Sequence, residues 1–382
     1  MNHELGLRVL SQIMEWSDEE ARREFRWLTF MSYYKYDDYR DYLSGVRFLE
    51  SLATWLQQFE FQDRHIAYQY IKNKLIYISP AEMQRLIEKF FPEIVQRHLV
   101  TTVSNDLGIS KHKVWSSRQA IEEFEWQTRK TLFMGASDGA RIDALRRANI
   151  GIISNEQVVV STQIDETKWK SLIKDLRVDL ENKRPGQGKN GKFSRIYLLD
   201  DFIASGTSLI RYNKDEDKYK GKLARFYESL DLAKANLCGT YGDFLEEDWE
   251  LIIHHYIGTE GAERIVNQRY KDAIAKGNKW TSNAHFTISM RLPEEICLNN
   301  ANDHGFVDIC KKYYDPFLEK GKHPGESGNS DMTFGFGQCA LPVVLEHNTP
   351  NNSLPLLWAE TSGSEMHHAM RPLFRRRQRH SD

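Results

Sequence analysis

The chain has 382 residues, of which 40% are hydrophobic and 12% aromatic, and its 52 basic and 54 acidic side chains leave a formal charge of −2. This composition excludes bulk disorder and predicts a globular protein with two or three domains of about 100–200 residues each. The near-neutral total excludes a general electrostatic coat for nucleic acid or anionic membranes, so contact with either would need a local patch of charge.

The amino-terminal sequence and the cysteines indicate a reduced, cytoplasmic environment. The start of the chain has neither the basic segment nor the uninterrupted apolar stretch of a signal peptide, and no window approaches the roughly 18 apolar residues of a membrane span. The four cysteines, Cys238, Cys297, Cys310 and Cys339, are widely spaced, without CxxC pairs or histidines at zinc-ligand intervals. We therefore expect reduced thiols, no structural metal site and no contact with a membrane.

Residues 1 to about 130 predict helices, because apolar side chains recur at intervals of three and four residues. Ser79 and Glu82 have the spacing of a capping box around the helix-opening Pro80, and Pro92 is expected to break or kink the helix that follows. The stretch 27–42 is crowded with aromatic residues, which could stack nucleic-acid bases but are more typical of a core or a partner-docking face.

A second pattern begins near residue 130, where short β-branched runs alternate with helical periodicity. Such alternation predicts a parallel α/β sheet, with function at the carboxyl ends of its strands. The predicted strands are 129–135, 156–163, 195–201, 249–258 and 285–292, and the predicted helices are 138–148, 166–181, 206–212 and 260–276.

The sharpest local pattern is RIYLLDDFIASGTSL, residues 195–209. Four apolar residues predict a buried strand, Asp200 and Asp201 end it, and a run of small residues predicts a turn into a helix. Backbone N–H groups at such a turn can hold a phosphate, and the two carboxylates can accept hydrogen bonds from sugar hydroxyls. The small residues of this predicted phosphate loop are Ala204, Ser205, Gly206, Thr207 and Ser208.

This stretch resembles the phosphoribosyl-pyrophosphate signature of the type I phosphoribosyltransferases, in which an apolar strand, two acids and a small-residue loop containing Gly-Thr follow one another. It contains neither the GKS or GKT of a Walker loop nor a GxGxxG fingerprint. The resemblance implies a parallel-sheet phosphoribosyltransferase-like core, a ribose phosphate ligand, and Asp200 and Asp201 as the catalytic pair.

A related pattern lies upstream, where LFMGASDGARIDALRRAN (132–149) predicts a strand, a turn of small residues and a basic helix. Such turns are common in α/β proteins, and tight packing explains this one equally well. The resemblance implies that the turn is the family's pyrophosphate loop, in which backbone amides and an arginine receive the diphosphate. The candidate residues are Gly135, Ala136, Ser137, Asp138, Gly139 and Arg141.

A glycine-rich basic segment, 183–195, separates these two patterns and contains five basic residues and no acid. Enzymes of the resembled family close a loop from this interval over the ligand and exclude water from the reacting sugar. Lys183 and Arg184 are therefore candidates to neutralise the departing pyrophosphate, although a solvated loop explains the segment equally well. The mixed-charge stretch 211–222 predicts a solvated connection.

The segment 334–360 contains a predicted strand and a polar turn. Its HNTPNNSLPLLW run resembles the phosphoribosyltransferase-like effector domain of bacterial antiphage cassettes, such as retrons and their relatives. This resemblance covers about residues 130–360. It implies a hood that holds the acceptor, with Asn348, Asn351 and Asn352 as substrate-binding candidates, although a purely structural turn explains them equally well.

The resemblance implies displacement of pyrophosphate from the anomeric carbon of ribose, with Mg²⁺ carried by the ligand's phosphates rather than by a protein cage. Where this chain has Ala204, the hypoxanthine and guanine enzymes have an aspartate, so ordinary 6-oxopurine salvage loses support and no general base is identified. Two functions stay open: an effector toxin that transfers or cleaves at ribose, and a non-catalytic nucleotide sensor. A nucleobase salvage enzyme is a further alternative.

Together these patterns predict an α/β protein in three parts. Residues 1–128 form an all-helical domain that docks a protein partner or regulates the site, residues 129–360 form the phosphoribosyltransferase-like domain with a small carboxyl-terminal hood, and residues 361–382 form a basic tail. The tail carries five arginines after residue 370. It is a candidate arm for nucleic acid, although a solvated end is the simpler interpretation.

Overall fold

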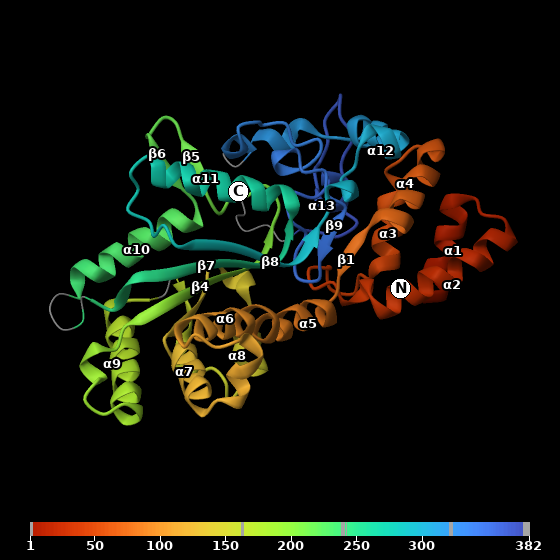
Figure 1. Cartoon of the computed structure of the whole chain (residues 1–382). Helices are drawn as coiled ribbons and strands as arrows, with labels where there is room; N and C mark the ends of the chain where they lie inside the picture. The colour runs from red at the N-terminus through yellow and green to blue at the C-terminus, as the bar shows by residue number, and fades with distance from the viewer. Residues whose placement is uncertain (1–2, 162–163, 238–240, 242, 321–323, 377–382) are drawn as a thin grey trace. The chain divides into compact units, whose positions relative to one another are not determined.

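The computed structural model describes residues 3–161, 164–237, 241, 243–320 and 324–376. Its contacts divide the chain into two compact units, whose elements are labelled in Figure 1. Unit 1 comprises residues 1–83 and 293–382, and unit 2 comprises residues 84–292.

These units do not follow the expected boundaries at residues 128 and 360. Helices beyond residue 84 pack on the sheet of unit 2, while the segment after residue 293 joins the core of the amino-terminal helices. The partner-docking role expected for residues 1–128 stays a prediction.

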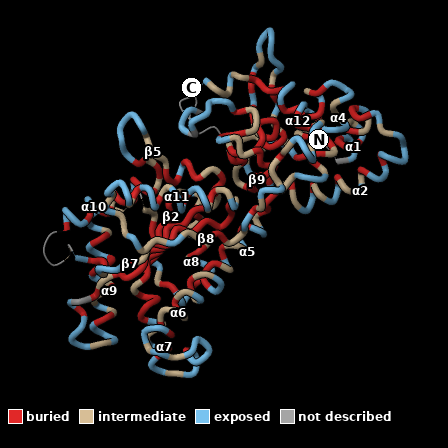
Figure 2. Tube along the Cα trace, turned by 45° about the horizontal axis from the view of Figure 1, so that its top comes forward, coloured by how far each residue is buried: buried red, intermediate tan, exposed pale blue. Residues whose placement is uncertain are grey.

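Unit 2 is built on a five-stranded sheet in which every neighbouring pair of strands is parallel, so the predicted α/β class is confirmed. In the order in which they lie, the strands are β3 (Val158–Val160), β2 (Thr131–Gly135), β4 (Phe193–Ile203), β7 (Leu245–Thr259) and β8 (Ala284–Leu292). The three central strands are buried along most of their length, as expected for a parallel sheet covered on both faces, and Figure 2 shows this burial, whereas the edge strand β8 is mostly only half-buried.

Helices cover both faces of this sheet (Figure 1). On one face, the ring of Phe90 contacts those of Tyr197 and Tyr256. On the other face, Leu223 and Val266 belong to an apolar cluster that includes the alternate strand residues. The helices of this part of the chain are α5 (Pro80–Phe90), α6 (Gln96–Asp106), α7 (Arg118–Arg129), α8 (Ile142–Ala148), α9 (Glu166–Lys183), α10 (Lys222–Asn236) and α11 (Glu260–Ala275).

The predicted start of α5 is confirmed. The backbone N–H of Ser79 donates to Glu82 Oε2 at 2.7 Å, and the N–H of Glu82 donates to Ser79 Oγ at 3.3 Å, which completes the capping box. Pro92 lies in a π-helical turn, Phe91–Val95, that separates α5 from α6. A proline lacks the N–H that a regular helix needs, so this irregularity is the expected one.

The helix predicted at 206–212 is wrong. The chain forms a turn there and then an antiparallel hairpin, β5 (Arg211–Asn213) with β6 (Lys218–Lys220), and the next helix begins only at Lys222. The stretch predicted as a solvated connection is therefore this hairpin, since its alternation of Arg211, Tyr212, Tyr219 and Lys220 suits paired strands.

Unit 1 combines helices with one two-stranded parallel sheet. Strand β1 (Ile76–Ile78) lies in the segment expected to be all helical, and it pairs with β9 (Val343–Leu345) from the far end of the chain. The helices of unit 1 are α1 (His3–Met14), α2 (Asp18–Tyr34), α3 (Phe48–Gln57), α4 (Phe61–Lys74), α12 (Asn300–Lys312) and α13 (Pro355–Trp358).

Short 3₁₀ turns connect the elements of both units. They are Tyr36–Asp38, Lys111–Ser116, Asp138–Ala140, Asn155–Gln157, Gly188–Asn190, Glu294–Ile296, Pro316–Lys320, Pro324–Ser327 and Phe336–Gln338.

The carboxyl-terminal segment is packed into unit 1 as far as the structure describes it. Phe374 is fully buried, and its ring contacts those of Tyr36, Tyr39 and Phe48. The expectation of a solvated tail is therefore wrong for residues 370–374, because Met370, Leu373 and Phe374 supply apolar side chains to the core. The arginines at 377 and 379 lie outside the described residues.

The aromatic stretch 27–42 serves two purposes. Tyr36 and Tyr39 are buried in the core of unit 1, as the pattern predicted. Phe30, Tyr33 and Tyr34 instead lie on the surface of α2, with exposed fractions of 58%, 72% and 66%. An exposed aromatic cluster of this kind is typical of an interaction face.

None of the helices in the described part of the chain is long and apolar enough to cross a membrane. Cys297, Cys310 and Cys339 carry free thiols, and Cys238 lies outside the described residues.

Candidate ligand-binding site

The strand order of unit 2 has its topological switch point between β2 and β4. Strand β3 lies on one side of β2, and β4, which follows it in the chain, lies on the other side. At such a reversal the two loops that leave the carboxyl ends diverge, which makes this edge the usual ligand site of an open parallel sheet. The turn 135–141 follows β2, and the loop 204–208 follows β4, so both predicted loops lie at this edge.

Asp200 lies at the centre of this edge and is almost completely buried. The Ser137 hydroxyl donates to its Oδ1, and the Lys222 ammonium binds its Oδ2. Burial raises the pKa of the Asp200 carboxyl above its ordinary value, while the Lys222 ammonium opposes that shift. A hydrogen bond thus joins the turn after β2 to an acid in the last part of β4.

Asp201 has the opposite orientation, because successive residues of a strand point to opposite faces of the sheet. It is partly exposed, and its Oδ1 accepts a hydrogen bond from the N–H of Phe202 at 2.8 Å. A Cβ built on Gly139 would lie 2.5 Å from Asp201 Oδ2, so the turn after β2 packs closely against this carboxylate.

The turn 135–141 is a tight strand-to-helix connection. The N–H of Ala136 donates to the carbonyl of Leu199 at 2.8 Å, which ties the start of the turn to β4. Residues 138–140 form a 3₁₀ turn, and Arg141 has a left-handed backbone, with φ 48°, just before α8 begins. The connection from the end of β2 to the start of α8 is therefore only six residues long, 136–141.

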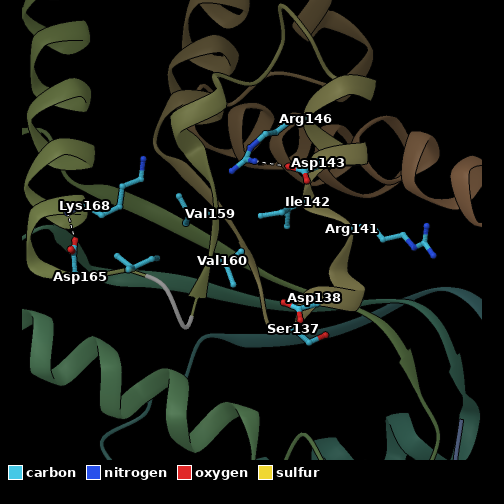
Figure 3. Close-up of a pocket in the computed structure, with 11 residues that line it drawn as sticks. Ser137, Asp138, Arg141, Ile142, Asp143, Arg146, Val159, Val160, Asp165 and Lys168 are labelled. Carbon is cyan, nitrogen blue, oxygen red and sulfur yellow. Dashed lines mark hydrogen bonds and ion pairs between the residues drawn. The ribbon is translucent and has the colours of Figure 1, made fainter. Parts of the chain in front are cut away.

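A cavity of about 660 Å³ opens beside this turn (Figure 3). Three of the predicted residues, Ser137, Asp138 and Arg141, line it. Basic side chains that the sequence reasoning did not select, Arg146 and Lys168, line it too. The further lining residues are Ile142, Asp143, Val159, Val160, Ile164 and Asp165.

Carboxylates in and beside this cavity order its walls. Arg146 pairs with Asp143 at 2.8 Å, and Asp165 caps α9 by accepting the N–H of Lys168 at 2.7 Å. The cavity is therefore lined by three bases and three acids, which suits a polar ligand better than an apolar one.

The loop 204–208 is held by its neighbours rather than by a following helix. The Thr259 hydroxyl donates to the carbonyl of Ala204 at 2.9 Å, and the N–H of Thr207 donates to Ser205 Oγ at 3.4 Å. Gly206 has φ +71°, and a Cβ there would lie 2.9 Å from Val266 Cγ2, so this position requires glycine. Since no helix starts here, the expected contribution of a helix dipole to phosphate binding is absent from the loop.

Two residues of the site escaped the sequence reasoning. Lys222 was expected to lie in a solvated connection. The hairpin β5–β6 instead reverses the chain, so that the Lys222 ammonium binds Asp200. His255 lies next to Asp200 in the sheet, with its Nε2 3.9 Å from Asp200 Oδ2, and burial lowers the pKa of His255 well below its ordinary value. The only sequence signal for His255 is a polar pair, with His254, inside an otherwise apolar strand.

The structure does not bring Lys183 and Arg184 to Asp200. Both residues precede β4, which begins at Phe193. Asp200 lies seven residues after Phe193, which is about 23 Å along an extended strand. Lys183 pairs with Glu125 at 3.4 Å, and Arg184 pairs with Glu123 at 2.6 Å, so both side chains bind α7. Lys168, in the first turn of α9, is the lysine that lines the cavity.

The candidates Asn348, Asn351 and Asn352 belong to unit 1, not to the unit that contains the acid pair. Asn352 is buried, and its Nδ2 donates to the carbonyl of Phe336 at 2.8 Å. The carbonyl of Asn351 accepts the N–H of Phe336 at 2.7 Å, and Asn348 closes a turn by donating to the carbonyl of Leu345 at 3.0 Å. The Asn352 side chain thus has a structural role in unit 1, and the substrate-binding role expected for the three residues stays a prediction.

The acid pair is not arranged as a metal cage. Within the described ranges, no three side chains of histidine, cysteine, aspartate or glutamate group so as to hold an ion. Asp200 has both oxygens engaged, and Asp201 Oδ1 already accepts a backbone N–H. The residues present therefore do not fit a magnesium ion held by the protein itself.

Comparison with known families gives one relationship. The chain matches the model of the PRTase-CE family over residues 52–376, which is most of its length. No curated protein and no solved structure matches it significantly.

Proposed function

The chain belongs to the PRTase-CE family and is a phosphoribosyltransferase-like protein; from this premise we propose that unit 2 binds phosphoribosyl pyrophosphate or a related ribonucleotide at the carboxyl ends of β2 and β4. The observation that carries the proposal is the meeting of Asp200 and Asp201 with the turn 135–141 at the switch point of the sheet. Carboxylates suit the sugar hydroxyls, and the cavity's bases suit the phosphates.

In the proposed reaction, the bond between the anomeric carbon and the pyrophosphate oxygen breaks, and pyrophosphate leaves with the electron pair. The acceptor's nucleophilic atom forms the new bond to that carbon and loses its proton to water. Asp201 would hold a ribose hydroxyl, Asp200 would order the edge of the site, and the turn 135–141 with Arg141 would receive the diphosphate. Magnesium is proposed only as a companion of the ligand's phosphates, and no step depends on it.

We propose further that the protein acts in the cytoplasm as an effector toxin of an antiphage cassette of the retron type. This role is supported by the resemblance of the HNTPNNSLPLLW run to such effectors. A protein partner on residues 1–128 is supported by the exposed rings of Phe30, Tyr33 and Tyr34. The basic tail remains a candidate contact for nucleic acid.

Calorimetry tests the ligand. Phosphoribosyl pyrophosphate, titrated with magnesium into the full chain, is expected to bind, and Asp201→Asn is expected to weaken binding at least tenfold, about 1.4 kcal/mol. Glu247→Gln is the matched control, because Glu247 is an exposed acid elsewhere in β7. The absence of any heat with the wild-type chain would remove the proposed ligand.

A non-catalytic sensor is the second candidate, and one observation favours it. Asp200 has both oxygens engaged within the protein, by Ser137 and Lys222, which suits a carboxylate that holds the site together better than one that takes part in a reaction. Release of pyrophosphate from the bound ligand, measured over hours, separates the two functions. An effector should also arrest growth when expressed, and equal arrest by Asp201→Asn would show that toxicity does not arise at this site.

A further inference from the structure

Lys222 supplies a positive charge to the buried acid of the site. Its ammonium binds Asp200 Oδ2, while Ser137 occupies Oδ1, so neither oxygen of Asp200 is available to a second cation. The Asp200 side chain is 3% exposed and that of Lys222 21%, so the carboxylate is sealed and the ammonium remains partly accessible.

The chain positions Lys222 through its backbone as well as through this ion pair. The N–H of Lys222 donates to the carbonyl of Ser208 at 3.0 Å, and the N–H of Leu223 donates to the carbonyl of Leu209 at 3.0 Å. Gly221 has φ +114°, and a Cβ there would lie 2.5 Å from the carbonyl oxygen of Leu209. The hairpin β5–β6 therefore returns the chain to the end of the loop 204–208, where only glycine fits the approach.

The start of α10 then fixes this position. Leu223 is fully buried, and Phe226 and Tyr227 pack into the same apolar cluster as the sheet. The backbone of Lys222 is thus held in place by the first turn of a well-packed helix, which limits the positions that its side chain can reach.

The histidine beside Asp200 does not supply positive charge. His255 lies in the adjacent strand, 3.9 Å from the same oxygen, and burial together with the Lys222 ammonium lowers the pKa of this imidazole well below its ordinary value. The charge that balances Asp200 therefore comes from Lys222.

We propose that Lys222 is the resident cation of this site: its ammonium neutralises Asp200 in place of a divalent metal and presents its remaining N–H donors to an anionic ligand oxygen beside the loop 204–208. An ammonium has three donors and Asp200 takes one of them, so the others can reach a phosphate or a sugar oxygen. Asp200 is then a positioning residue for Lys222, and Asp201 is the acid that faces the ligand.

Metal binding by the full chain without ligand tests this assignment. Mn²⁺, which favours the same oxygen ligands as Mg²⁺, is titrated at pH 8 and followed by electron paramagnetic resonance. We expect the wild-type chain and Asp200→Asn to bind the same number of Mn²⁺ ions, because Asp200 holds no metal in the wild type. We expect Lys222→Ala to gain one site, Lys222→Ala with Asp200→Asn to lose it again, and Lys222→Arg to behave as wild type. A wild-type site that depends on Asp200, or a folded Lys222→Ala chain that gains none, would overturn the proposal.

A thermodynamic cycle covers the case in which a single variant folds poorly. Urea unfolding is measured for the wild-type chain, Lys222→Met, Asp200→Asn and the double variant. The folding equilibrium constant of the double variant should exceed the value expected for independent effects by at least about tenfold, because removing both partners leaves no unpaired charge. If Lys222→Met does not fold but the double variant does, the proposal is supported in the same way. Strictly additive effects of the two substitutions on the free energy of unfolding contradict it. Neither measurement uses phosphoribosyl pyrophosphate, so failure here is separate from failure of the proposed ligand.

Discussion

Gly139 packs against the carboxylate of Asp201, so closely that a Cβ on the glycine would lie 2.5 Å from Oδ2 and 2.6 Å from Cγ. Gly139 has no left-handed backbone angle, so the requirement for glycine arises from space alone. The turn after β2 thereby sets the position of an acid near the carboxyl end of β4.

Gly139→Ala is expected to displace Asp201 and to weaken binding of phosphoribosyl pyrophosphate at least tenfold, about 1.4 kcal/mol, while the chain remains folded. Calorimetry measures the affinity, and circular dichroism checks the fold. Gly325→Ala is the control, since a Cβ at Gly325 would have no neighbour within 4 Å. Unchanged affinity in Gly139→Ala would show that the contact with Asp201 has no part in ligand binding.

A second prediction concerns the ion pair at the amino end of the sheet. Glu250 Oε2 lies 2.7 Å from Nε of the buried Arg195 and 3.1 Å from Nε2 of His98. Burial alone would raise the pKa of Glu250, but the hydrogen bonds from His98 and Arg195 outweigh it and lower the pKa to about 2. Glu250→Ala leaves Arg195 buried without its carboxylate.

We expect Glu250→Ala to lower the free energy of unfolding by about 3 kcal/mol, as is typical when one partner of a buried pair is removed. Urea unfolding measures this loss. The exposed Glu247 of the same strand supplies the control, because Glu247→Ala should change stability by less than about 0.5 kcal/mol. Equal effects of the two substitutions would contradict the role given to Glu250.

A third prediction concerns the dependence of stability on pH. His254 is fully buried, with Nδ1 2.9 Å from Thr287 Oγ1 and Nε2 3.1 Å from Ser289 Oγ, and burial lowers its pKa from 6.5 to about 3. The imidazole is neutral in the folded chain and gains a proton on unfolding between these two values. Stability contributed by His254 is therefore complete above pH 6.5 and falls as the pH drops toward 3.

His254→Asn should reduce the slope of the unfolding free energy between pH 5 and 6 by about 1.4 kcal/mol per pH unit. Urea unfolding at several pH values measures the slope in both chains. His255 has the same direction of shift and keeps part of the dependence in the variant. Identical slopes for the variant and the wild type would mean that His254 is protonated in the folded chain.

A fourth prediction concerns the carboxyl-terminal segment of unit 1. Phe374 is fully buried among aromatic rings, at 5.2 Å from the Tyr39 centroid and 5.6 Å from that of Tyr77. Phe374→Ala should lower the free energy of unfolding by about 3–5 kcal/mol, because it leaves a cavity in a closed core. Phe317→Ala is the matched control, since Phe317 is 60% exposed. A loss no larger than the control's would place Phe374 outside the core in solution.

The sequence predicted the parts of the fold that depend on local patterns. The capping box at Ser79, the strand that contains Asp200 and the turn after β2 each depend on a few consecutive residues, and the structure has all three. The strand was expected to end at the acid pair, whereas β4 continues to Ile203. Ser137 meets Asp200 because segments near the carboxyl ends of adjacent parallel strands lie together.

The missed features depend on contacts between distant segments. Lys222 reaches Asp200 only because the hairpin β5–β6 reverses the chain, and the charges around it look like those of any solvated loop. Lys183 and Arg184 were assigned to the site by their place between two motifs, whereas strand direction puts them at the other end of β4.

The division of the chain into units escaped prediction for the same reason. The pairing of β1 with β9 joins residues from opposite ends of the chain, and nothing in either three-residue apolar run specifies the other as its partner. The burial of Phe374 likewise depends on side chains of the amino-terminal segment, such as Tyr36 and Phe48.

The pairing of β1 with β9 also has a consequence for synthesis. When the ribosome has synthesised all of unit 2, residues 343–345 have not yet been synthesised. Strand β1 therefore has no partner strand at the stage when all strands of the unit 2 sheet are present. Unit 2 can therefore form on the nascent chain before unit 1 is complete. A chain cut short after residue 292 would contain the proposed ligand site without the rest of unit 1, and nascent-chain proteolysis at that length would show which unit has already become resistant.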